Sequence, residues 1–507
     1  MRKSGILMHI SSLPSPYGIG TLGKEAYRFV DFLRETGQSY WQVLPIGQTG
    51  FGDSPYQSFS TYAGNPYFID LDTLYEWGLL DNTGCRKINW GDNAEKVDFG
   101  LLYGTRYSLL QGAVENFLTT ASCSCQHDRN QLEDRLSYDD FCKQEGWWLN
   151  DYALFMALKE QQIGAPWHDW QVNLKRRNSC ALDAAKQKLE SKITFWKVIQ
   201  YWFFVQWGQL KKYANDNGIG IIGDIPIYTA QDSADVWANP EQFQLDEDLE
   251  PIEVAGCPPD GFSELGQLWG NPLFNWDFME ESNYSWWSNR IHHATQLFDV
   301  IRIDHFRGFD TYYAIPKNMP DARSGRWRRG PGIDFFRQIE RQNGKLSIIA
   351  EDLGLLFDSV RQLVKESGYP GMKVLQFAFD ESRDSEYLPH KYPKTCVVYT
   401  GTHDNDTILG WVEHAAKKEV DFAKIYLGLS ADEGYNWGMI RGALASAGDL
   451  VILTMQDVLG LPGWARMNTP ATLVGNWTWR MKDDAITPEV VEKLKEYTKI
   501  YGRANAD

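Results

Sequence analysis

The stretch VIRIDHFRG, residues 300–308, joins a run of β-branched and apolar residues to a cluster of charged and polar side chains. Such a run predicts a short buried strand, and its polar end suggests functional groups at the strand terminus. The same pattern recurs along the chain, and helix-like segments separate the later copies. The segments that we predict as strands are 5–10, 40–44, 219–223, 300–304, 347–351, 372–377, 396–400 and 451–455.

Helical patterns between these runs indicate how the strands are connected. Residues 191–217 carry an apolar stripe that includes Phe195 and Trp202, and Gly218 follows as a helix-ending glycine. Residues 333–343 form a second such segment, closed by Gly344. Alternating strands and helices are typical of a parallel sheet, and eight strands favour a closed barrel. We therefore expect α/β class and a single (β/α)8 TIM barrel over residues 1–507.

Two spacings between predicted strands are much longer than one connecting helix requires. We expect a mostly helical inserted subdomain at 46–190, after the second strand. A second, loop-rich insertion is expected at 225–297, after the third strand, and it includes a loop at 254–270 beside the active-site rim. The spacing of the remaining strands leaves no space for a β-sandwich domain after the eighth.

The charge balance excludes several classes of partner. The 507 residues include 50 Lys and Arg against 67 Asp and Glu, a net charge of −17. Proteins that bind nucleic acid or anionic membrane surfaces carry basic patches, so neither partner is expected. No apolar run is long enough to span a bilayer, and the apolar run near the N-terminus stops too soon for a signal peptide.

The cysteines indicate a reducing compartment. There are seven, an odd number, and their scatter does not suggest a disulfide framework, so we expect a cytoplasmic protein. The stretch CSCQH, residues 123–127, resembles a local cluster of metal-ligand residue types. It lacks a second ligand pair at a standard spacing, so no metal site is expected.

Aromatic residues are abundant, with 21 tryptophans in the chain. Aromatic faces stack on sugars and bases and on cations, and the acidic balance favours sugars among these. A tryptophan-rich core explains the same composition, and composition alone favours that explanation.

Carboxylates stand at the end of four of the predicted strands or shortly after it. Because a barrel presents the carboxyl ends of its strands at one rim, these side chains should meet there. Like charges held together are costly, and a catalytic site is the usual reason for bearing that cost. The four residues are Asp224, Asp304, Glu351 and Asp404.

Glycosidic bond cleavage requires such a set, with one carboxylate ionised as the nucleophile and one carboxyl protonated as the acid. Arg302 and Asp304 share one face of a strand, so the guanidinium is expected to lower the pKa of Asp304 and keep it charged. Crowding by Asp304 and Asp404 is expected to raise the pKa of Glu351, the candidate acid. Asp352 points to the opposite face and is expected to be structural.

Two further side chains complete this interpretation. Asp404, together with His403, is placed to bind sugar hydroxyls and to favour a distorted ring as positive charge develops. Asp224 lies further from the reacting atoms, where it can position Arg302 or a sugar hydroxyl.

The carboxylate segments resemble the conserved regions of the α-amylase clan. The surrounding sequence resembles more particularly the 4-α-glucanotransferases of the amylomaltase family, glycoside hydrolase family 77. Each short motif alone is weak, but their order over nearly the whole chain is highly specific. The matching stretches are 8–15, 18–20, 52–57, 64–67, 232–237, 258–263, 266–272, 465–470 and 475–477.

The resemblance implies a role for each matching residue. Asp304 would be the nucleophile, Glu351 the general acid and then base, and Asp404 the transition-state stabiliser. The resemblance also implies maltooligosaccharide, maltodextrin, glycogen or starch-derived substrates and no cofactor. The substrate-binding residues that it implies are Ser54, Tyr56, Asp224, Gln267, Trp269, Arg302, His403 and Asn468.

Two positions depart from the family pattern. Gly261 stands where some members carry a tyrosine that stacks on the acceptor, and Phe262 is the expected substitute. Ala471 stands where a glycine is usual. Neither position touches the carboxylates, so these differences bear on acceptor preference only.

Carboxylates do not distinguish transfer from hydrolysis, because both reactions begin with a glycosyl-enzyme. A transferase must offer its acceptor a high effective molarity and exclude water, and loop 254–270 is the candidate lid, with glycines 256, 261 and 266 as hinges. The alternatives are a maltodextrin-hydrolysing amylase of the same clan, a catalytically dead glucan-binding protein, and a TIM barrel of other chemistry. Transfer of an α-1,4-glucan segment between maltodextrins is the preferred interpretation.

Overall fold

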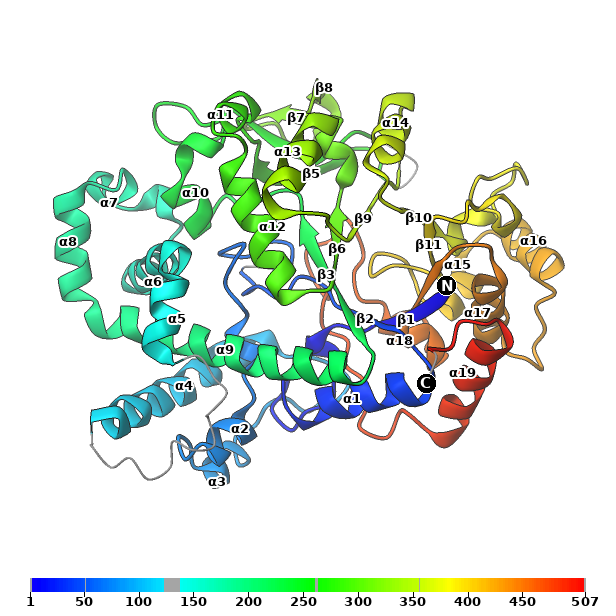
Figure 1. The fold of residues 1–507 in the computed structure, drawn as a ribbon, viewed down its shortest axis with the longest axis horizontal. Coiled ribbons are helices and arrows are strands. Elements are labelled where there is room, and N and C mark those ends of the chain that lie inside the picture. Colours follow the sequence, from blue (N-terminus) through cyan, green and yellow to red (C-terminus); the bar gives the residue numbers. More distant parts are fainter. Residues whose placement is uncertain (1, 51, 123–136, 260–262, 355, 506–507) are drawn as a thin grey trace.

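Eight parallel strands close into a barrel (Figure 1). The computed structural model describes residues 2–50, 52–122, 137–259, 263–354 and 356–505. Around the barrel the strand order is β1-β12-β11-β10-β9-β6-β3-β2. Their bounds are β1 Lys3–Leu7, β2 Tyr40–Gln42, β3 Gly220–Pro226, β6 Val300–Asp304, β9 Ile348–Ala350, β10 Gly371–Val374, β11 Cys396–Tyr399 and β12 Leu450–Thr454.

All eight predicted strands overlap these barrel strands, and the bounds of β6 match the prediction. The first and last strands pair in parallel, with Lys3 opposite Leu450 and Leu7 opposite Thr454, which closes the barrel. Strands β3 and β6 pair with Asp224 opposite Arg302 and place the ends of both strands at one rim. The expectation of a (β/α)8 barrel is confirmed.

Helices surround the barrel strands. Helix α9 ends at Asp216, and Gly218 follows with a φ of +75°, a left-handed conformation that glycine adopts without strain. Helix α13 coincides with the predicted segment 333–343. The helices that accompany the barrel are α1 Lys24–Glu35, α9 Glu190–Asp216, α12 Ser285–Leu297, α13 Ile333–Asn343, α14 Asp358–Ser367, α15 Ile408–His414, α16 Lys417–Leu427, α17 Tyr435–Ala445, α18 Met455–Val458 and α19 Pro488–Ile500.

The chain between β2 and β3 is largely helical and lies to one side of the barrel (Figure 1). Helix α6 packs against the long helix α9, and residues of both helices belong to the main core. The limits 46–190 of an inserted subdomain stay a prediction. The helices in this stretch are α2 Leu71–Glu76, α3 Asn82–Cys85, α4 Phe99–Ser122, α5 Tyr138–Gln144, α6 Gly146–Gln161, α7 Val172–Lys175 and α8 Ser179–Lys188.

The limits 225–297 of a second insertion stay a prediction, and this stretch holds more regular structure than the loop-rich description suggests. This stretch holds α10 Ala234–Ala238, β4 Glu253–Cys257, β5 Gln267–Pro272, α11 Trp276–Glu281 and α12. Strands β4 and β5 join β7 Thr311–Pro316 and β8 Arg326–Arg329 in a four-stranded sheet of order β5-β4-β7-β8. Strands β4 and β5 lie between β3 and β6 in the chain, whereas β7 and β8 lie between β6 and β9. Two separate connections between barrel strands therefore form one sheet. None of the four strands of this sheet is among the predicted strands.

The two ends of the predicted loop 254–270 are the antiparallel strands β4 and β5, called here the β4–β5 hairpin. Gly256 lies within β4, and a Cβ there would be 2.3 Å from the carbonyl oxygen of Gln267 and 2.4 Å from Ile315 Cδ1. This glycine therefore allows close strand approach and is not a hinge. Gly266 is at the hairpin turn with a φ of +70°. The predicted hinge Gly261 and the predicted stacking residue Phe262 lie outside the described residues.

After β12 the described residues 455–505 form helices, turns and loops, and no strand of a C-terminal sandwich is among them. Within the described part of the chain, no helix combines the length and the apolar character needed to cross a bilayer.

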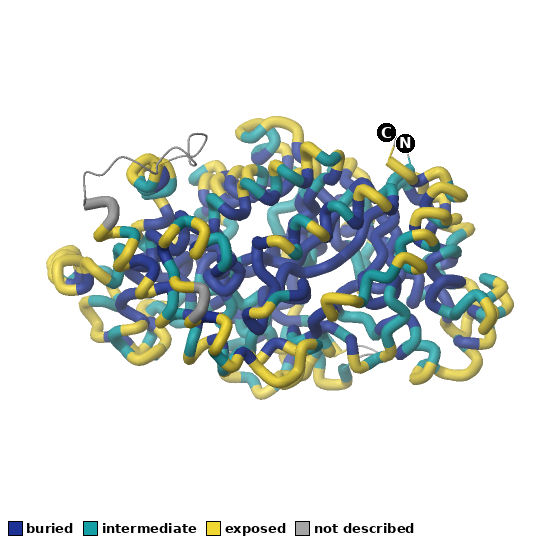
Figure 2. Tube along the Cα trace, turned by 90° about the horizontal axis from the view of Figure 1, so that it is seen from below, coloured by how far each residue is buried: buried dark blue, intermediate teal, exposed yellow. Residues whose placement is uncertain are grey.

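The tryptophans lie mostly in the core, as composition alone favoured. Figure 2 shows the buried residues running through the centre of the molecule with the exposed ones around the rim. Trp147 and Trp464 are large exceptions, with 48% and 49% of their surface exposed. The tryptophans that are fully buried are Trp41, Trp167, Trp202, Trp207, Trp237 and Trp287.

Candidate active site

A buried arginine joins two of the predicted carboxylates. Arg302 Nη1 lies 2.6 Å from Asp224 Oδ2 and 3.0 Å from Asp304 Oδ1. The Arg302 side chain is 4% exposed and that of Asp224 is fully buried. A buried cation is tolerated only when it is paired, and here the charges of Asp224 and Asp304 outweigh desolvation and raise the pKa of Arg302. The arginine thus fixes the direction of the Asp304 carboxylate, and Asp224 fixes the arginine.

The pKa of Asp304 differs from the expectation. Burial raises the pKa of Asp304, and the charge of Asp224 adds to this increase. Arg302 lowers the pKa, as predicted, but by less, so the pKa lies at about 6. The adjacent guanidinium can be inferred from the strand pattern, whereas the burial of Asp304 at the barrel mouth cannot. Asp304 is therefore still ionised at neutral pH, but its pKa lies closer to neutral pH than predicted.

Glu351 follows β9 and is held by two backbone donors. The N–H of His305 donates to Oε2 over 2.7 Å, and the N–H of Leu353 donates to Oε1 over 2.8 Å. Burial raises its pKa to about 8 despite these donors, and the charge of Asp304 is the second cause. The predicted direction is right, but crowding by Asp304 and Asp404 is not the main cause, since burial contributes most and Asp404 is not among the principal contributors.

The two carboxyl groups therefore titrate in order. Asp304 releases its proton first, with a pKa of about 6, and Glu351 second, with a pKa of about 8. At a pH between these two pKa values, Asp304 is ionised and Glu351 is protonated. The site then holds a nucleophile and a general acid together.

Asp404 lies on the loop that follows β11. Asn468 Nδ2 donates to Asp404 Oδ1 over 2.6 Å, and His403 Nε2 lies 3.3 Å from the same oxygen. The ring of Tyr56 stacks on His403 at a centroid distance of 5.0 Å, and its hydroxyl donates to Asp224 Oδ2 over 2.9 Å. Tyr56 thus joins the Asp224–Arg302 pair to the Asp404 loop.

The remaining predicted residues lie around this centre at different distances. Ser54 contacts Tyr56 through its hydroxyl, which accepts the backbone N–H of Tyr56 over 3.3 Å. Trp269 donates to Gln267 Oε1 over 3.0 Å and packs edge-on against His305 at 4.9 Å, which brings the β4–β5 hairpin beside Asp304.

Asp352, which follows Glu351, points away from the site, as predicted. Its Oδ1 accepts the backbone N–H of Met372 at the start of the next strand over 2.7 Å. This contact makes Asp352 a structural residue.

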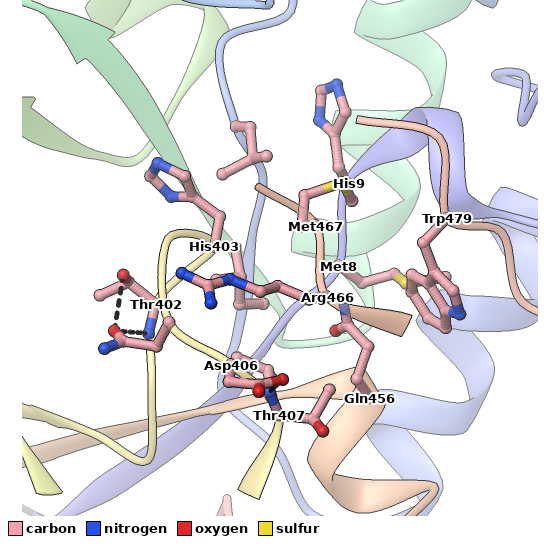
Figure 3. Close-up of a pocket in the computed structure, with 14 residues that line it drawn as sticks. Met8, His9, Thr402, His403, Asp406, Thr407, Gln456, Arg466, Met467 and Trp479 are labelled. Carbon is pink, nitrogen blue, oxygen red and sulfur yellow. Dashed lines mark hydrogen bonds between the residues drawn. The ribbon is translucent and has the colours of Figure 1, made fainter. Parts of the chain in front are cut away.

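Sequence reasoning missed two residues of this site. His305 adopts a left-handed conformation, φ +54°, that aims its N–H at Glu351, and this conformation is too uncommon for a non-glycine residue to be predicted from sequence. Arg466 contacts the Asp404 loop, and Figure 3 shows it near His403. Its position after a short helical turn near the C-terminus gave no chemical clue.

No group of three or more His, Cys, Asp or Glu is arranged to hold a metal ion among the described residues. The stretch 123–127, considered above as a metal-ligand cluster, lies outside them.

The comparisons with known proteins identify the family of the chain. The family described as 4-alpha-glucanotransferase matches residues 8–487 of the chain. The chain belongs to glycoside hydrolase family 77. A family 77 relative, the 4-alpha-glucanotransferase of Clostridium butyricum, is 49% identical over 98% of this chain and 100% of its own length. The 4-alpha-glucanotransferase of Thermus thermophilus is 46% identical over 97% of each chain.

Solved structures show the same family 77 fold. The amylomaltase from Streptococcus agalactiae in complex with acarbose superposes with a TM-score of 0.95 and 43% identity, and covers 100% of both chains. The amylomaltase from Corynebacterium glutamicum is 18% identical with a TM-score of 0.77, over 99% of this chain and 75% of that one. The second match speaks for the fold alone.

Proposed function

We propose that this protein is a 4-α-glucanotransferase that moves an α-1,4-glucan segment from a maltodextrin donor to the 4-hydroxyl of an acceptor glucan or glucose. The pair Asp304 and Glu351, which lies at one barrel rim with pKa values of about 6 and 8, carries the glycosyl-enzyme chemistry, and the similarity to curated 4-alpha-glucanotransferases over nearly the whole chain favours transfer over hydrolysis. Membership of family 77 adds independent support. Maltooligosaccharides and glycogen- or starch-derived glucans are the proposed substrates, and the cytoplasm is the proposed location.

The reaction follows from the protonation states of the pair. Protonated Glu351 gives its proton to the glycosidic oxygen while ionised Asp304 attacks C1, and the bond between C1 and that oxygen breaks. The leaving glucan departs with the proton, and the donor segment remains as an ester of Asp304. Glu351, now ionised, takes the proton of the acceptor 4-hydroxyl as that oxygen attacks C1. The ester bond breaks, Asp304 is released, and two inversions give net retention.

The other groups of the site serve the positively charged transition state. Asp404, with His403, binds hydroxyls of the reacting sugar and favours the distorted ring that carries partial positive charge. Arg302 holds the nucleophile in line, and Asp224 holds Arg302. Tyr56 provides an aromatic face for the donor sugar beside His403.

The hairpin of β4 and β5 is the proposed acceptor side. Trp269 and Gln267 lie on β5. The ring of Trp269 contacts His305, the residue that follows Asp304. Together with Asn468, Ser54 and Phe262 they would contact the glucan chain. By lining the approach to C1 they raise the effective concentration of a sugar hydroxyl relative to water. The inserted segments 46–190 and 225–297 would form the walls of this cleft.

Incubation with maltotriose tests the proposal. The expected products are a ladder of longer maltodextrins and free glucose, with a nearly constant total of reducing ends. Glucose and maltose alone, with rising reducing ends, would show a hydrolase. Binding of maltodextrin without any product would show a catalytically dead glucan-binding protein.

A further inference from the structure

The loop that carries Asp404 leaves the barrel before it reaches the active site. Strand β11 ends at Tyr399, five positions before Asp404, whereas Asp304 is the last residue of β6. Glu351 directly follows β9, and its backbone N–H donates to the carbonyl of Ile303 over 3.1 Å. The barrel therefore fixes two of the three carboxylates, and Asp404 depends on contacts from elsewhere.

Part of this support is internal to the loop. The backbone N–H and the hydroxyl of Thr402 both donate to Asn405 Oδ1 over 2.9 Å, the bonds drawn as dashed lines in Figure 3. The N–H of Asp404 donates to Thr402 Oγ1 over 3.2 Å. These bonds give the loop its shape, but they do not attach it to the rest of the site.

Arg466 supplies an attachment. Its Nη2 donates to the backbone carbonyl of Asp404 over 2.5 Å, and its Nε donates to the carbonyl of Asn468 over 2.7 Å. Asn468 in turn donates its side-chain amide to Asp404 Oδ1 over 2.6 Å and its backbone N–H to the carbonyl of His403 over 3.0 Å. One guanidinium thus ties the backbone of Asp404 to the residue that orients the Asp404 carboxylate.

We propose that Arg466 is a positioning residue that sets the direction of the Asp404 carboxylate, an inference that rests on the role given to Asp404 in the proposed function. The planar guanidinium serves two carbonyls in fixed directions, which the single ammonium of a lysine does not reproduce. Asn468 and His403 both contact Oδ1 of Asp404. Oδ2 has no hydrogen bond among the described residues and is presented to a sugar hydroxyl.

The substitution Arg466→Lys tests the proposal, with Arg480→Lys as the matched control. Arg480 is 5% exposed and also joins two segments through a backbone carbonyl, that of Ser15 over 2.8 Å, but it does not contact Asp404. We expect Arg466→Lys to lower kcat for maltotriose disproportionation by about 10- to 100-fold, because a small misplacement of a reacting group costs that much. We expect KM to change by less than about twofold.

The melting temperature separates positioning from general stabilisation. We expect Arg466→Lys to melt no lower than Arg480→Lys, while only Arg466→Lys loses kcat. A kcat of Arg466→Lys within twofold of the wild type would overturn the proposal. So would a loss of kcat in Arg480→Lys as large as that in Arg466→Lys.

A double-mutant cycle with Asn468→Ala adds a second readout. If Arg466 and Asn468 both act by placing Asp404, the double variant should be no slower than the slower single variant. A loss equal to the product of the two single losses would mean that the residues act independently, against the proposal. Asp404→Asn separates the two hypotheses: wild-type kcat in that variant would refute the role of Asp404, whereas an inactive Asp404→Asn beside an unaffected Arg466→Lys would refute the positioning role alone.

Discussion

The separated pKa values of Asp304 and Glu351 set the pH dependence of the first chemical step. Only the form with Asp304 ionised and Glu351 protonated reacts. With pKa values of about 6 and 8, this form makes up roughly 80% of the free enzyme at pH 7 and roughly 9% at pH 5 or pH 9. We therefore expect kcat/KM for maltotriose to fall by about tenfold on either side of neutrality, with the acid limb due to Asp304.

A donor that needs no proton assigns the alkaline limb. Fluoride leaves α-maltosyl fluoride without general acid help, so the first step then requires only ionised Asp304. We expect the alkaline limb near pH 8 to disappear from kcat/KM for this donor, while the acid limb near pH 6 remains. Fluoride release, followed with an ion-selective electrode between pH 4.5 and pH 9.5, provides the measurement (roughly 1.5 units beyond each pKa).

The matched variant is Glu351→Gln, which cannot protonate any donor. It should lose most of its activity with maltotriose and release fluoride from the activated donor with a single acid limb. An alkaline limb that persists with the fluoride donor in the wild type would refute the assignment of Glu351 as the general acid. A missing acid limb would refute the ionised Asp304.

Three further outcomes are expected. Asp304→Ala should lower kcat by about a thousandfold or more, since no glycosyl-enzyme forms, with an unchanged circular dichroism spectrum; wild-type activity would end the mechanism. Gly256→Ala should lower the free energy of unfolding by about 1–3 kcal/mol, because its Cβ would lie 2.3 Å from the Gln267 carbonyl oxygen. An unchanged urea midpoint would show that strands β4 and β5 move apart at no cost in stability. Phe262→Ala should raise glucose release relative to transfer on long glucan, and an unchanged ratio would remove this residue from the acceptor side.

The barrel was predictable because each of its strands is a short apolar run with a distinct end. Buried parallel strands leave such runs in the sequence, and the carboxylates after them mark the rim. The small sheet was not predictable in the same way. Strand β8, residues 326–329, is the run Arg-Trp-Arg-Arg, whose three cationic side chains do not suggest a strand. It pairs with β7, and β7 pairs with β4, which belongs to the segment that follows β3.

The residues of the site and their order of ionisation were predictable from the sequence, but the physical causes of their pKa shifts were less so. The residue types and the order of ionisation follow from sequence, but the burial that raises the pKa of Asp304 depends on how the loops cover the barrel mouth. The support of Asp404 by Arg466 depends on two loops that lie 62 positions apart in the chain. Contacts of this kind are set by tertiary packing and leave no local pattern.

The pairing of β1 with β12 has a consequence for synthesis on the ribosome. Lys3 and Leu450 are neighbours in the finished barrel, but the chain between them must be translated first, which takes about 20–90 s at ordinary elongation rates. During this time β1 has β2 on one side and no partner on the other, and an unpaired strand edge invites association with other chains. Nascent chains truncated before residue 450 should therefore bind chaperones more strongly than chains extended past residue 454.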